Sequence, residues 1–242
     1  RESLVAVGDR AVVHPMPGSG WLLTSLEPRR TRLSRPGPDA RDHLDIVVAA
    51  NLDALVIVVS VDRPRFHPRF VDRFLVAAQW GGVAPALFLN KCDLGIEEPD
   101  LSTYRRLGVP VFRGSAETGE GLEELRQFVS GKWSAFAGNS GVGKSSLIRE
   151  LIPGANAEIG EVRNKDGRGR HTTTRAKVYQ LSADTRIVDT PGIRELAMHR
   201  LSAQEIQLCL CFHAFGHDAQ MQALTHRDDG FGDRAAVGVV GN

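Results

Sequence analysis

Almost continuous apolar runs alternate with segments of helical periodicity through the middle of the chain. Asp53–Val61 is nearly all apolar, as expected of a parallel strand buried on both faces. Pro68–Trp80 follows with the spacing of an amphipathic helix, and another apolar run ends at Leu89. The alternation continues with apolar runs at Val109–Phe112, Trp133–Ala137 and Arg186–Val188, and with helical segments at Gly121–Val129 and Ser145–Leu151. This pattern predicts an α/β domain with a doubly wound, mostly parallel sheet.

The first 35 residues have a different pattern. Two short β-like runs, Ala11–Val13 and Trp21–Leu26, flank a turn at Pro15–Gly20, which fits the later strands of a small β-barrel. Ser34–Asp42, with two prolines and a glycine, is typical of a linker. From Leu196 to Asn242 the sequence has a helical pattern at first and then becomes irregular. We expect three parts: a partial barrel over residues 1–36, an α/β domain over 43–196 and a small C-terminal module over 197–242.

Composition narrows the class of protein. The chain has 242 residues, 42% of them apolar, and a net charge of +1, as in ordinary globular proteins. That charge hides two basic clusters, five arginines from Arg29 to Arg41 and six lysines or arginines from Arg163 to Lys177, which suit either phosphate contacts or solvated loops. Three cysteines make no disulfide framework and fit a cytoplasmic protein. No apolar run reaches the roughly 18 residues of a membrane span, so we expect no membrane partner.

A phosphate-binding loop follows the apolar run Trp133–Ala137. It comprises Gly138, Asn139, Ser140, Gly141, Val142, Gly143, Lys144, Ser145 and Ser146. Its glycines allow successive backbone N–H groups to face phosphates. Lys144 would reach the β- and γ-phosphates, and Ser145 would place its hydroxyl on Mg²⁺. Strand, glycine-rich turn and helix in this order predict a nucleoside triphosphate site but leave the base open.

An Asn-Lys-x-Asp motif after the second apolar run indicates the base. The carboxylate of Asp93 accepts hydrogen bonds from the guanine N1–H and exocyclic amine, donors that adenine does not present in that arrangement. Asn90 can tie this loop to the phosphate loop, and the stem of Lys91 can cover the base. Ser115 and Ala116, after the next strand, would place a backbone N–H on the guanine oxygen. Together these residues predict GTP and GDP as ligands and disfavour an ATP-using enzyme.

The order of these motifs along the chain is unusual. Guanine-nucleotide switches ordinarily run from the phosphate loop through the switch segments to the base-recognition motifs. Here the motifs at Asn90 and Ser115 precede the phosphate loop, and Asp189-Thr190-Pro191-Gly192 follows it. Because the ends of a compact α/β domain often lie close together, rejoining them leaves the core contacts intact. The order therefore predicts a circularly permuted GTPase domain.

Hydrolysis would depend on the segment around His171 and on the motif that starts at Asp189. Asp189 would hold Mg²⁺ through water, and the Gly192 N–H could sense the γ-phosphate. Many GTPases carry a glutamine at the next position to orient the attacking water, whereas this chain has Ile193, which cannot do so. His171 is the candidate for that task, the other interpretation being a structural or RNA-facing residue. Among the neighbouring threonines, Thr174 is the expected Mg²⁺ ligand.

Six segments carry a resemblance to one family: Pro28–Arg35, Ala49–Asp53, Asn90–Asp93, Gly138–Ser146, Gly167–Thr174 and Asp189–Leu196. On these residues the chain resembles the bacterial ribosome small-subunit-dependent GTPase A family, circularly permuted GTPases that act late in assembly of the 30S ribosomal subunit. The resemblance implies an N-terminal RNA-binding barrel of the oligonucleotide/oligosaccharide type, the GTPase domain and a small zinc module. It also implies contact with 16S rRNA, activation by the small subunit and a hydrophobic replacement for the catalytic glutamine, which Ile193 supplies.

The C-terminal module departs from that family's zinc site. Read without gaps, the family pattern Cys-x4-Cys-x-His-x5-Cys falls on Ala219, Leu224, His226 and Gly232. Only the histidine matches, and the other three side chains cannot bind zinc, so we expect no zinc there. Four nearby residues could form a different zinc site: Cys209, Cys211, His213 and His217. Core packing is the other interpretation of the two cysteines.

Two functions from different classes stay open on the sequence. The first is a monomeric GTP hydrolase that matures 30S subunits and is activated by them. The second is a nucleotide-gated paralogue that binds GTP and GDP, barely hydrolyses, and contacts RNA or protein without ribosomal activation. The switch histidine and threonines favour the first function. Ile193 and the missing zinc ligands are compatible with the second.

Overall fold

A seven-stranded sheet forms the centre of the molecule. The computed structural model describes residues 5–18, 20–36, 45–152, 158–163 and 175–189. The strands of the sheet are β5 (Ala54–Ser60), β6 (Ala84–Asn90), β7 (Val111–Arg113), β8 (Trp133–Ala137), β9 (Glu158–Arg163), β10 (Arg175–Gln180) and β11 (Arg186–Asp189). The described helices are α1 (Pro68–Trp80), α2 (Ser102–Arg106), α3 (Leu122–Val129), α4 (Lys144–Leu151) and the short 3-10 helix η1 (Cys92–Leu94).

The strand order creates a place for a ligand. The strand order of the sheet is β7-β6-β5-β8-β11-β10-β9. The first five strands are parallel, β10 is antiparallel to β11, and β9 is antiparallel to β10. From β5 the chain moves outward to β6 and β7, and then returns to the other side of β5 to form β8. Such a reversal opens a crevice beyond the carboxyl ends of the two central strands, where doubly wound sheets bind ligands. The predicted α/β fold with a mostly parallel sheet is confirmed.

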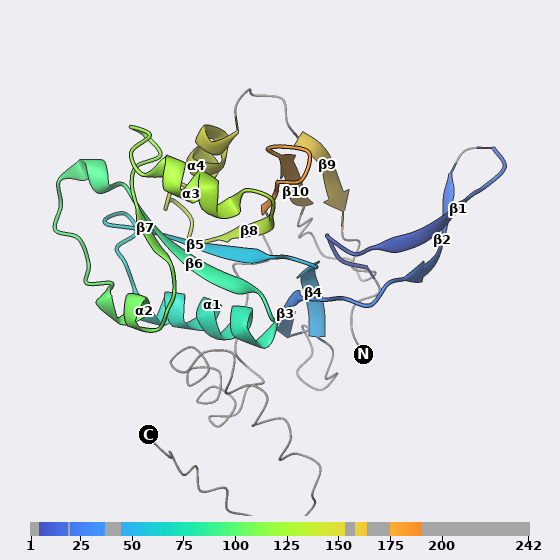
Figure 1. The fold of residues 1–242 in the computed structure, drawn as a ribbon, viewed down its shortest axis with the longest axis horizontal. Coiled ribbons are helices and arrows are strands. Elements are labelled where there is room, and N and C mark those ends of the chain that lie inside the picture. Colours follow the sequence, from blue (N-terminus) through green and yellow to red (C-terminus); the bar gives the residue numbers. More distant parts are fainter. Residues whose placement is uncertain (1–4, 19, 37–44, 153–157, 164–174, 190–242) are drawn as a thin grey trace, which may run out of the picture.

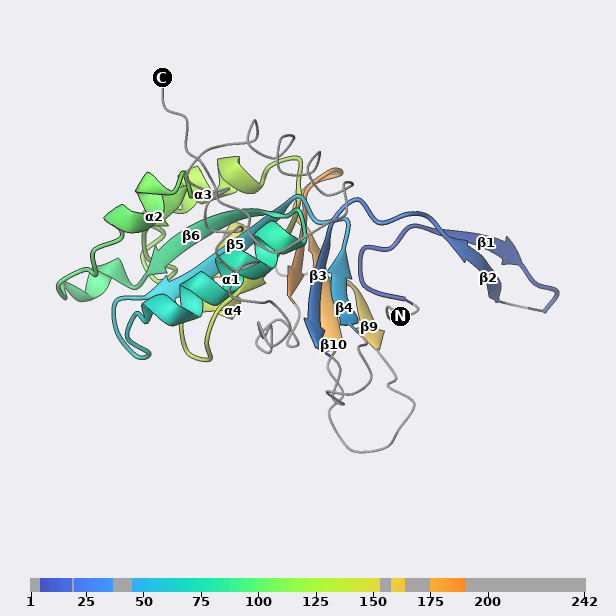
Figure 2. The ribbon, with the colours of Figure 1, turned by 90° about the horizontal axis from the view of Figure 1, so that it is seen from below.

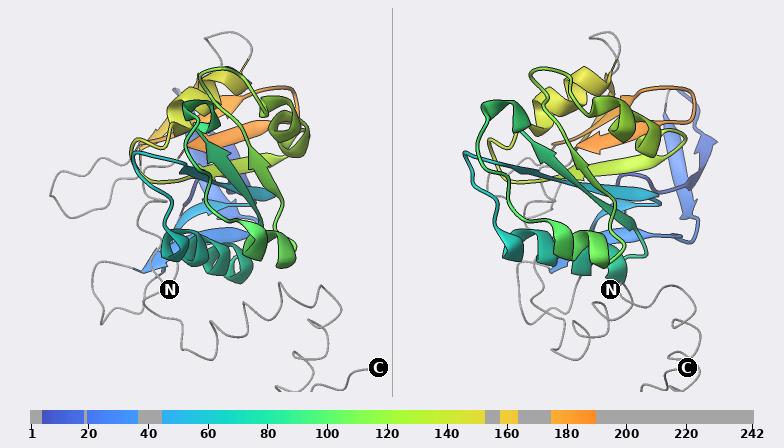
Figure 3. Two further views of the ribbon diagram at one scale, coloured as in Figure 1. Left: turned by 90° about the vertical axis from the view of Figure 1, so that its left-hand side faces the viewer. Right: turned by 60° about the vertical axis from the view of Figure 1, so that its left-hand side comes forward.

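Helices cover both faces of the sheet. α1 and α2 lie on one face, and α3 and α4 lie on the other (Figures 1 and 3). Because both faces are covered, every residue of β5 is buried, which explains its unbroken apolar sequence. The predicted helix at Pro68–Trp80 and the predicted strand at Trp133–Ala137 match α1 and β8 at both ends.

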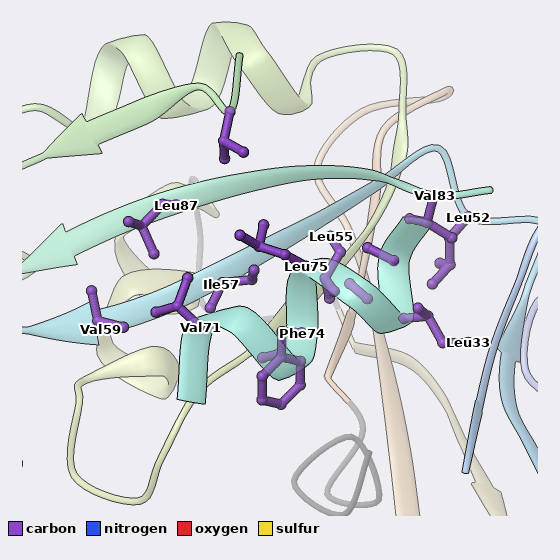
Figure 4. Packing of buried hydrophobic residues seen from close by; sticks show 14 of the residues in the cluster. Leu33, Leu52, Leu55, Ile57, Val59, Val71, Phe74, Leu75, Val83 and Leu87 are labelled. Atoms are coloured by element: carbon purple, nitrogen blue, oxygen red, sulfur yellow. The ribbon is translucent and has the colours of Figure 1, made fainter. Parts of the chain in front are cut away.

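The apolar stripe of α1 packs on the central strands. Val71, Phe74 and Leu75 of the helix belong to one cluster with Ile57 of β5 and Leu87 of β6 (Figure 4). Each such side chain stabilises the fold by about 1.5–3 kcal/mol when it is fully buried, relative to the same side chain exposed to water. On the opposite face, the second cluster includes Leu125, Phe136, Leu147, Ile148 and Leu151. These two hydrophobic clusters fix the strands in place. The strand ends that lead into the motif loops are therefore rigid.

Two antiparallel hairpins precede the sheet. β1 (Ala11–Pro15) pairs with β2 (Trp21–Leu26), as the sequence predicts, and β3 (Arg32–Pro36) pairs with β4 (Asp45–Ala50). The β1–β2 hairpin extends away from the rest of the described fold (Figures 1 and 2). Among the described residues, no helix is both long and apolar enough to cross a bilayer.

The predicted linker at Ser34–Asp42 is wrong over its first three residues, which belong to β3. Leu33 is fully buried in the main core, and the Arg32 N–H donates to the carbonyl oxygen of Gly81 at 2.9 Å. Pairing with β4 gives the backbone N–H and C=O groups of β3 hydrogen-bond partners. These hydrogen bonds to a distant segment outweigh the local preference of proline and glycine for loops. The boundaries of the three expected parts stay predictions.

Candidate nucleotide-binding site

The described motif residues gather at one edge of the sheet. Asn90 ends β6, Ser115 comes two residues after β7, the phosphate loop follows β8, and Asp189 ends β11. These strands are parallel, so their carboxyl ends lie at the same edge, beyond the reversal between β5 and β8. Motifs that are far apart in the sequence are thereby brought to the edge where doubly wound sheets bind ligands.

Asn90 joins the loops of this edge. The residue is 2% exposed. Its Nδ2 donates to the carbonyl oxygen of Val142 in the phosphate loop at 2.7 Å, and its Oδ1 accepts from the N–H of Ala116 at 2.9 Å. The predicted tie between the base motif and the phosphate loop is confirmed. The second hydrogen bond, to the loop after β7, was not indicated by the sequence.

The phosphate loop closes tightly around this asparagine. Gly143 has φ +93°, and a Cβ at this position would overlap the Asn90 amide nitrogen, so the close approach needs glycine. α4 begins at the next residue, Lys144, whose Nζ donates to the carbonyl oxygens of Gly138 at 2.6 Å and Asn139 at 2.9 Å. The ammonium group therefore lies against the loop, at the start of a helix whose N–H groups attract anions.

The base motif presents one exposed carboxylate. Asp93 lies in η1 and is exposed, and its carboxylate has no hydrogen bond or ion pair with the other residues that the structure describes. Lys91 precedes it with φ +66°. The Lys91 Nζ donates to the backbone carbonyl oxygens of Asp62 at 3.2 Å and Arg63 at 2.7 Å, in the segment after β5. The lysine thus fixes the motif to a neighbouring loop and leaves the Asp93 carboxylate available to a base.

The loop after β7 is ordered from within. Ser115 is buried, and its Oγ accepts from the N–H groups of Glu117 at 3.0 Å and Thr118 at 3.2 Å. The sequence predicts that this pair places one backbone N–H on the guanine oxygen, and both N–H groups of the pair are engaged within the protein: that of Ser115 donates to the Glu120 carbonyl oxygen and that of Ala116 to Asn90 Oδ1. A contact with the guanine oxygen would have to share the Ala116 N–H with Asn90.

Arg113, at the end of β7, holds the two base-recognition loops together. Its Nη2 lies 2.8 Å from Oε1 of Glu98, after the base motif, and its Nη1 lies 3.0 Å from Oε1 of Glu120, in the loop after β7. The hydrogen bonds from Arg113 lower the pKa of the Glu98 carboxyl, so the ion pair is charged at neutral pH. Nothing in the sequence distinguished this arginine, because its partners meet only in the folded chain.

Two of the predicted Mg²⁺ ligands lie at this edge. Ser145 is exposed in the first turn of α4, and Asp189 ends β11 opposite Phe136 of the adjacent strand β8. Hydroxyl and carboxylate oxygens are the donors that Mg²⁺ prefers, so the residues present fit this ion. Within the described part of the chain, no group of three or more histidine, cysteine, aspartate or glutamate side chains is placed to hold a metal.

Several predicted site residues lie outside the described ranges. They are His171, Thr174, Gly192 and Ile193, together with the C-terminal positions Cys209, Cys211, His213, His217, Ala219, Leu224, His226 and Gly232. Their roles stay predictions.

Two arginines of the N-terminal basic cluster, Arg29 and Arg30, make structural contacts within the protein. Arg29 makes two hydrogen bonds to the buried Asp9 carboxylate, at 2.7 and 2.8 Å, and Arg30 pairs with Asp53 at 2.7 Å. Asn51 bridges the same region, because its Oδ1 accepts from the Arg30 N–H at 2.8 Å and its Nδ2 donates to a backbone carbonyl oxygen at 2.9 Å. Whether the cluster also contacts phosphate stays a prediction. The two arginines join the N-terminal segments to the start of β5.

The comparisons with known proteins agree with this geometry. The family model described as RsgA GTPase matches residues 26–199. A relative from Shewanella oneidensis, the small ribosomal subunit biogenesis GTPase RsgA, is 38% identical over 96% of this chain. The solved structure of YjeQ from Thermotoga maritima is 32% identical over 88% of this chain and 69% of its own, with a TM-score of 0.64. YloQ, a circularly permuted GTPase, has a TM-score of 0.57 over 86% of this chain and 64% of its own, and at 24% identity supports the fold alone.

These relatives are longer than the present chain. The chain spans 69% of the Shewanella oneidensis protein and 56–60% of several other curated relatives. The family match nevertheless covers the whole central sheet with the base motif, the phosphate loop and Asp189 in the permuted order. By sequence, by fold and by the arrangement of its motifs, the chain belongs to the RsgA GTPase family.

Proposed function

We propose that this protein hydrolyses GTP and acts in maturation of the small, 30S, ribosomal subunit in the cytoplasm, as a monomer that contacts 16S rRNA. The observation that carries the proposal is the position of Asn90, buried between the phosphate loop and the loop of Ser115 and Ala116, beside the exposed carboxylate of Asp93. Membership of the RsgA GTPase family and the names of its curated relatives support the ribosomal role.

Base selection would rest on Asp93. Its carboxylate accepts from the guanine N1–H and exocyclic amine, whereas the adenine ring leaves it without those donors and costs affinity. Lys91 supports it by fixing the motif to the segment after β5. The Ala116 N–H, shared with Asn90, would reach the guanine oxygen.

Phosphate binding would rest on the loop at the start of α4. Its backbone N–H groups and the Lys144 ammonium would surround the β- and γ-phosphates, replacing the lysine's hydrogen bonds to Gly138 and Asn139. Ser145, Asp189 and Thr174 would hold Mg²⁺, which, when bound, neutralises charge on the transferred phosphate. The Gly192 N–H would sense the γ-phosphate.

Water would be positioned by a residue other than Ile193, which is apolar. We propose His171, brought to the γ-phosphate when the basic segment from Arg163 to Lys177 docks on ribosomal RNA. Slow turnover without ribosomes and faster turnover with them would follow, because the histidine acts in the transition state only after the segment is ordered.

GTP turnover measured with and without purified 30S subunits tests the proposal. We expect stimulation by the subunits, and His171→Ala should remove most of it while GTP affinity stays near the parent's. If the alanine variant responds like the parent, His171 is not the water-positioning group. If neither protein responds although both bind GTP, the nucleotide-gated paralogue is the better description.

A further inference from the structure

A basic segment borders the phosphate loop and is not used by the nucleotide site. Between β5 and the first turns of α1, Asp62–Phe70 contains Arg63, Arg65, His67 and Arg69. Three arginines and one aspartate give it a net charge of +2 with the histidine neutral, against +1 for the whole chain. The segment therefore places a net positive charge beside the site.

Packing turns these basic side chains outward. Phe66 and Phe70 are partly buried against the main core, with ring centroids 6.2 Å from Tyr104 and 4.7 Å from Phe74 respectively. The basic residues alternate with them and are exposed, and the side chain of Arg63 is 92% exposed. The aromatic anchors therefore fix the backbone while the guanidinium groups face solvent.

The charges of this segment are largely unneutralised. Arg63 has a long contact with Asp62, at 3.5 Å, whereas the guanidinium groups of Arg65 and Arg69 have no hydrogen bond or ion pair with the residues that the structure describes. Four arginines elsewhere in the described fold behave differently: Arg29, Arg30, Arg113 and Arg126 pair with carboxylates at 2.7–3.0 Å. Planar guanidinium groups without a partner suit bidentate binding of phosphate.

The segment is also fastened to the nucleotide site. Its backbone carbonyl oxygens at Asp62 and Arg63 accept from the Lys91 ammonium of the base motif. The buried Ser60 hydroxyl donates to the Pro64 carbonyl oxygen at 2.7 Å, and Arg65 lines a small hollow together with Asn139 of the phosphate loop. A ligand bound to Asp62–Phe70 would therefore act on the loops that hold the nucleotide.

We propose that Asp62–Phe70 is a docking surface for the phosphate backbone of RNA, with Arg65 and Arg69 as its principal contacts. The inference rests on the proposed function, since the small ribosomal subunit supplies the RNA. It goes beyond that function by assigning the contact to the segment after β5, outside the switch region and the N-terminal hairpins. Each arginine would contact one phosphate without reading the base, so binding is salt-dependent and independent of sequence.

Fluorescence anisotropy of a fluorescein-labelled RNA hairpin, titrated with the full chain at several KCl concentrations, tests the surface. The variant R65Q/R69Q should bind more weakly than the parent. Its slope of log affinity against log salt should be shallower by about 1.5, since each phosphate contact contributes roughly 0.7–0.9. The control R126Q/R149Q removes the same charge from α3 and α4, on the opposite face of the sheet (Figure 1), and should keep the parent's slope.

Three results would overturn the inference: no RNA binding by the parent, equal slopes for R65Q/R69Q and the parent, or equal losses in both double variants. Polyglutamate that binds the parent as tightly as RNA, and R65Q/R69Q less, would assign the surface to an acidic protein instead. Unchanged melting temperature and GDP affinity show that R65Q/R69Q is folded. Because stimulation of GTP turnover by 30S subunits is measured separately, failure of this surface is distinguishable from failure of the proposed function.

Discussion

Truncation of Asn90 to alanine removes a buried side chain that joins the phosphate loop to the loop after β7. The variant loses the hydrogen bond from Nδ2 to the Val142 carbonyl oxygen, at 2.7 Å, and the one from the Ala116 N–H to Oδ1, at 2.9 Å. Val142 is 2% exposed and Ala116 is 8% exposed. Water therefore has little access to the two backbone groups that are left without a partner.

Each buried polar group that loses its partner costs about 1–3 kcal/mol, so the two together cost about 2–6 kcal/mol. Part of this loss lowers the free energy of unfolding, and part lowers nucleotide affinity because the two loops are no longer held in register. If about 1.4 kcal/mol of this loss falls on nucleotide binding, the dissociation constant of the nucleotide rises tenfold. We expect Asn90→Ala to weaken binding of a fluorescent GDP analogue at least about tenfold, measured by titration at a temperature where the variant is folded.

Asn51→Ala is the matched control. Asn51 also bridges two backbone segments, through the Arg30 N–H and the Gly8 carbonyl oxygen, but it precedes β5 at the opposite end of the strands. Its φ of +55° adds strain for alanine, so the control should lose stability and keep the parent's GDP affinity. The reasoning is refuted if folded Asn90→Ala binds GDP like the parent, or if both variants lose affinity equally.

Four further outcomes are expected. Asp93→Asn should shift preference from guanine toward xanthine nucleotides, whose ring offers the complementary acceptor, and unchanged preference in competition titrations would contradict the base assignment. Arg113→Met should weaken GDP binding a few-fold in low salt, whereas Arg126→Met, which breaks an exposed ion pair on α3, should not. Because the pKa of Glu98 is lowered from 4.5, the stabilisation from Arg113 should be present above that pH and disappear as the pH falls below it, measured as the difference in melting temperature between parent and variant. Metal analysis of purified, untagged protein should find no zinc, and one zinc per chain that resists mild chelation would show that the C-terminal residues bind it.

Hydrophobic periodicity, together with prolines and glycines at the ends of segments, identified the helices and strands that bury apolar residues. α1 and β8 could be placed to the residue because a proline begins the helix and a glycine ends the strand's apolar run. β3, β9 and β10 were missed because their sequences are short and rich in charged residues, and they form by pairing at sheet edges or in a hairpin. Such pairing depends on distant partners that a local pattern does not contain.

The residues of the candidate site also fall into two groups, those that the sequence indicated and those that follow only from the fold. Residues with fixed chemistry, such as Lys144 and Asp93, were identified by type and spacing. The contacts that position them were less visible, because Arg113 meets Glu98 and Glu120 only when β7 and the two loops assemble. The engagement of the Ala116 N–H by Asn90 likewise joins residues 26 positions apart in the sequence. Positioning residues of this kind have no local signature and follow from the fold.

Competition between GTP and ATP for the unaltered protein tests the central claim most directly. Each nucleotide is added with Mg²⁺ to the complex with a fluorescent GDP analogue, and displacement is followed by the loss of fluorescence. Because the Asp93 carboxylate finds its donors only on guanine, GTP should displace the analogue at a concentration at least about a hundredfold lower than ATP. Displacement by ATP and GTP at equal concentrations would contradict the assignment of this edge of the sheet as a guanine-nucleotide site.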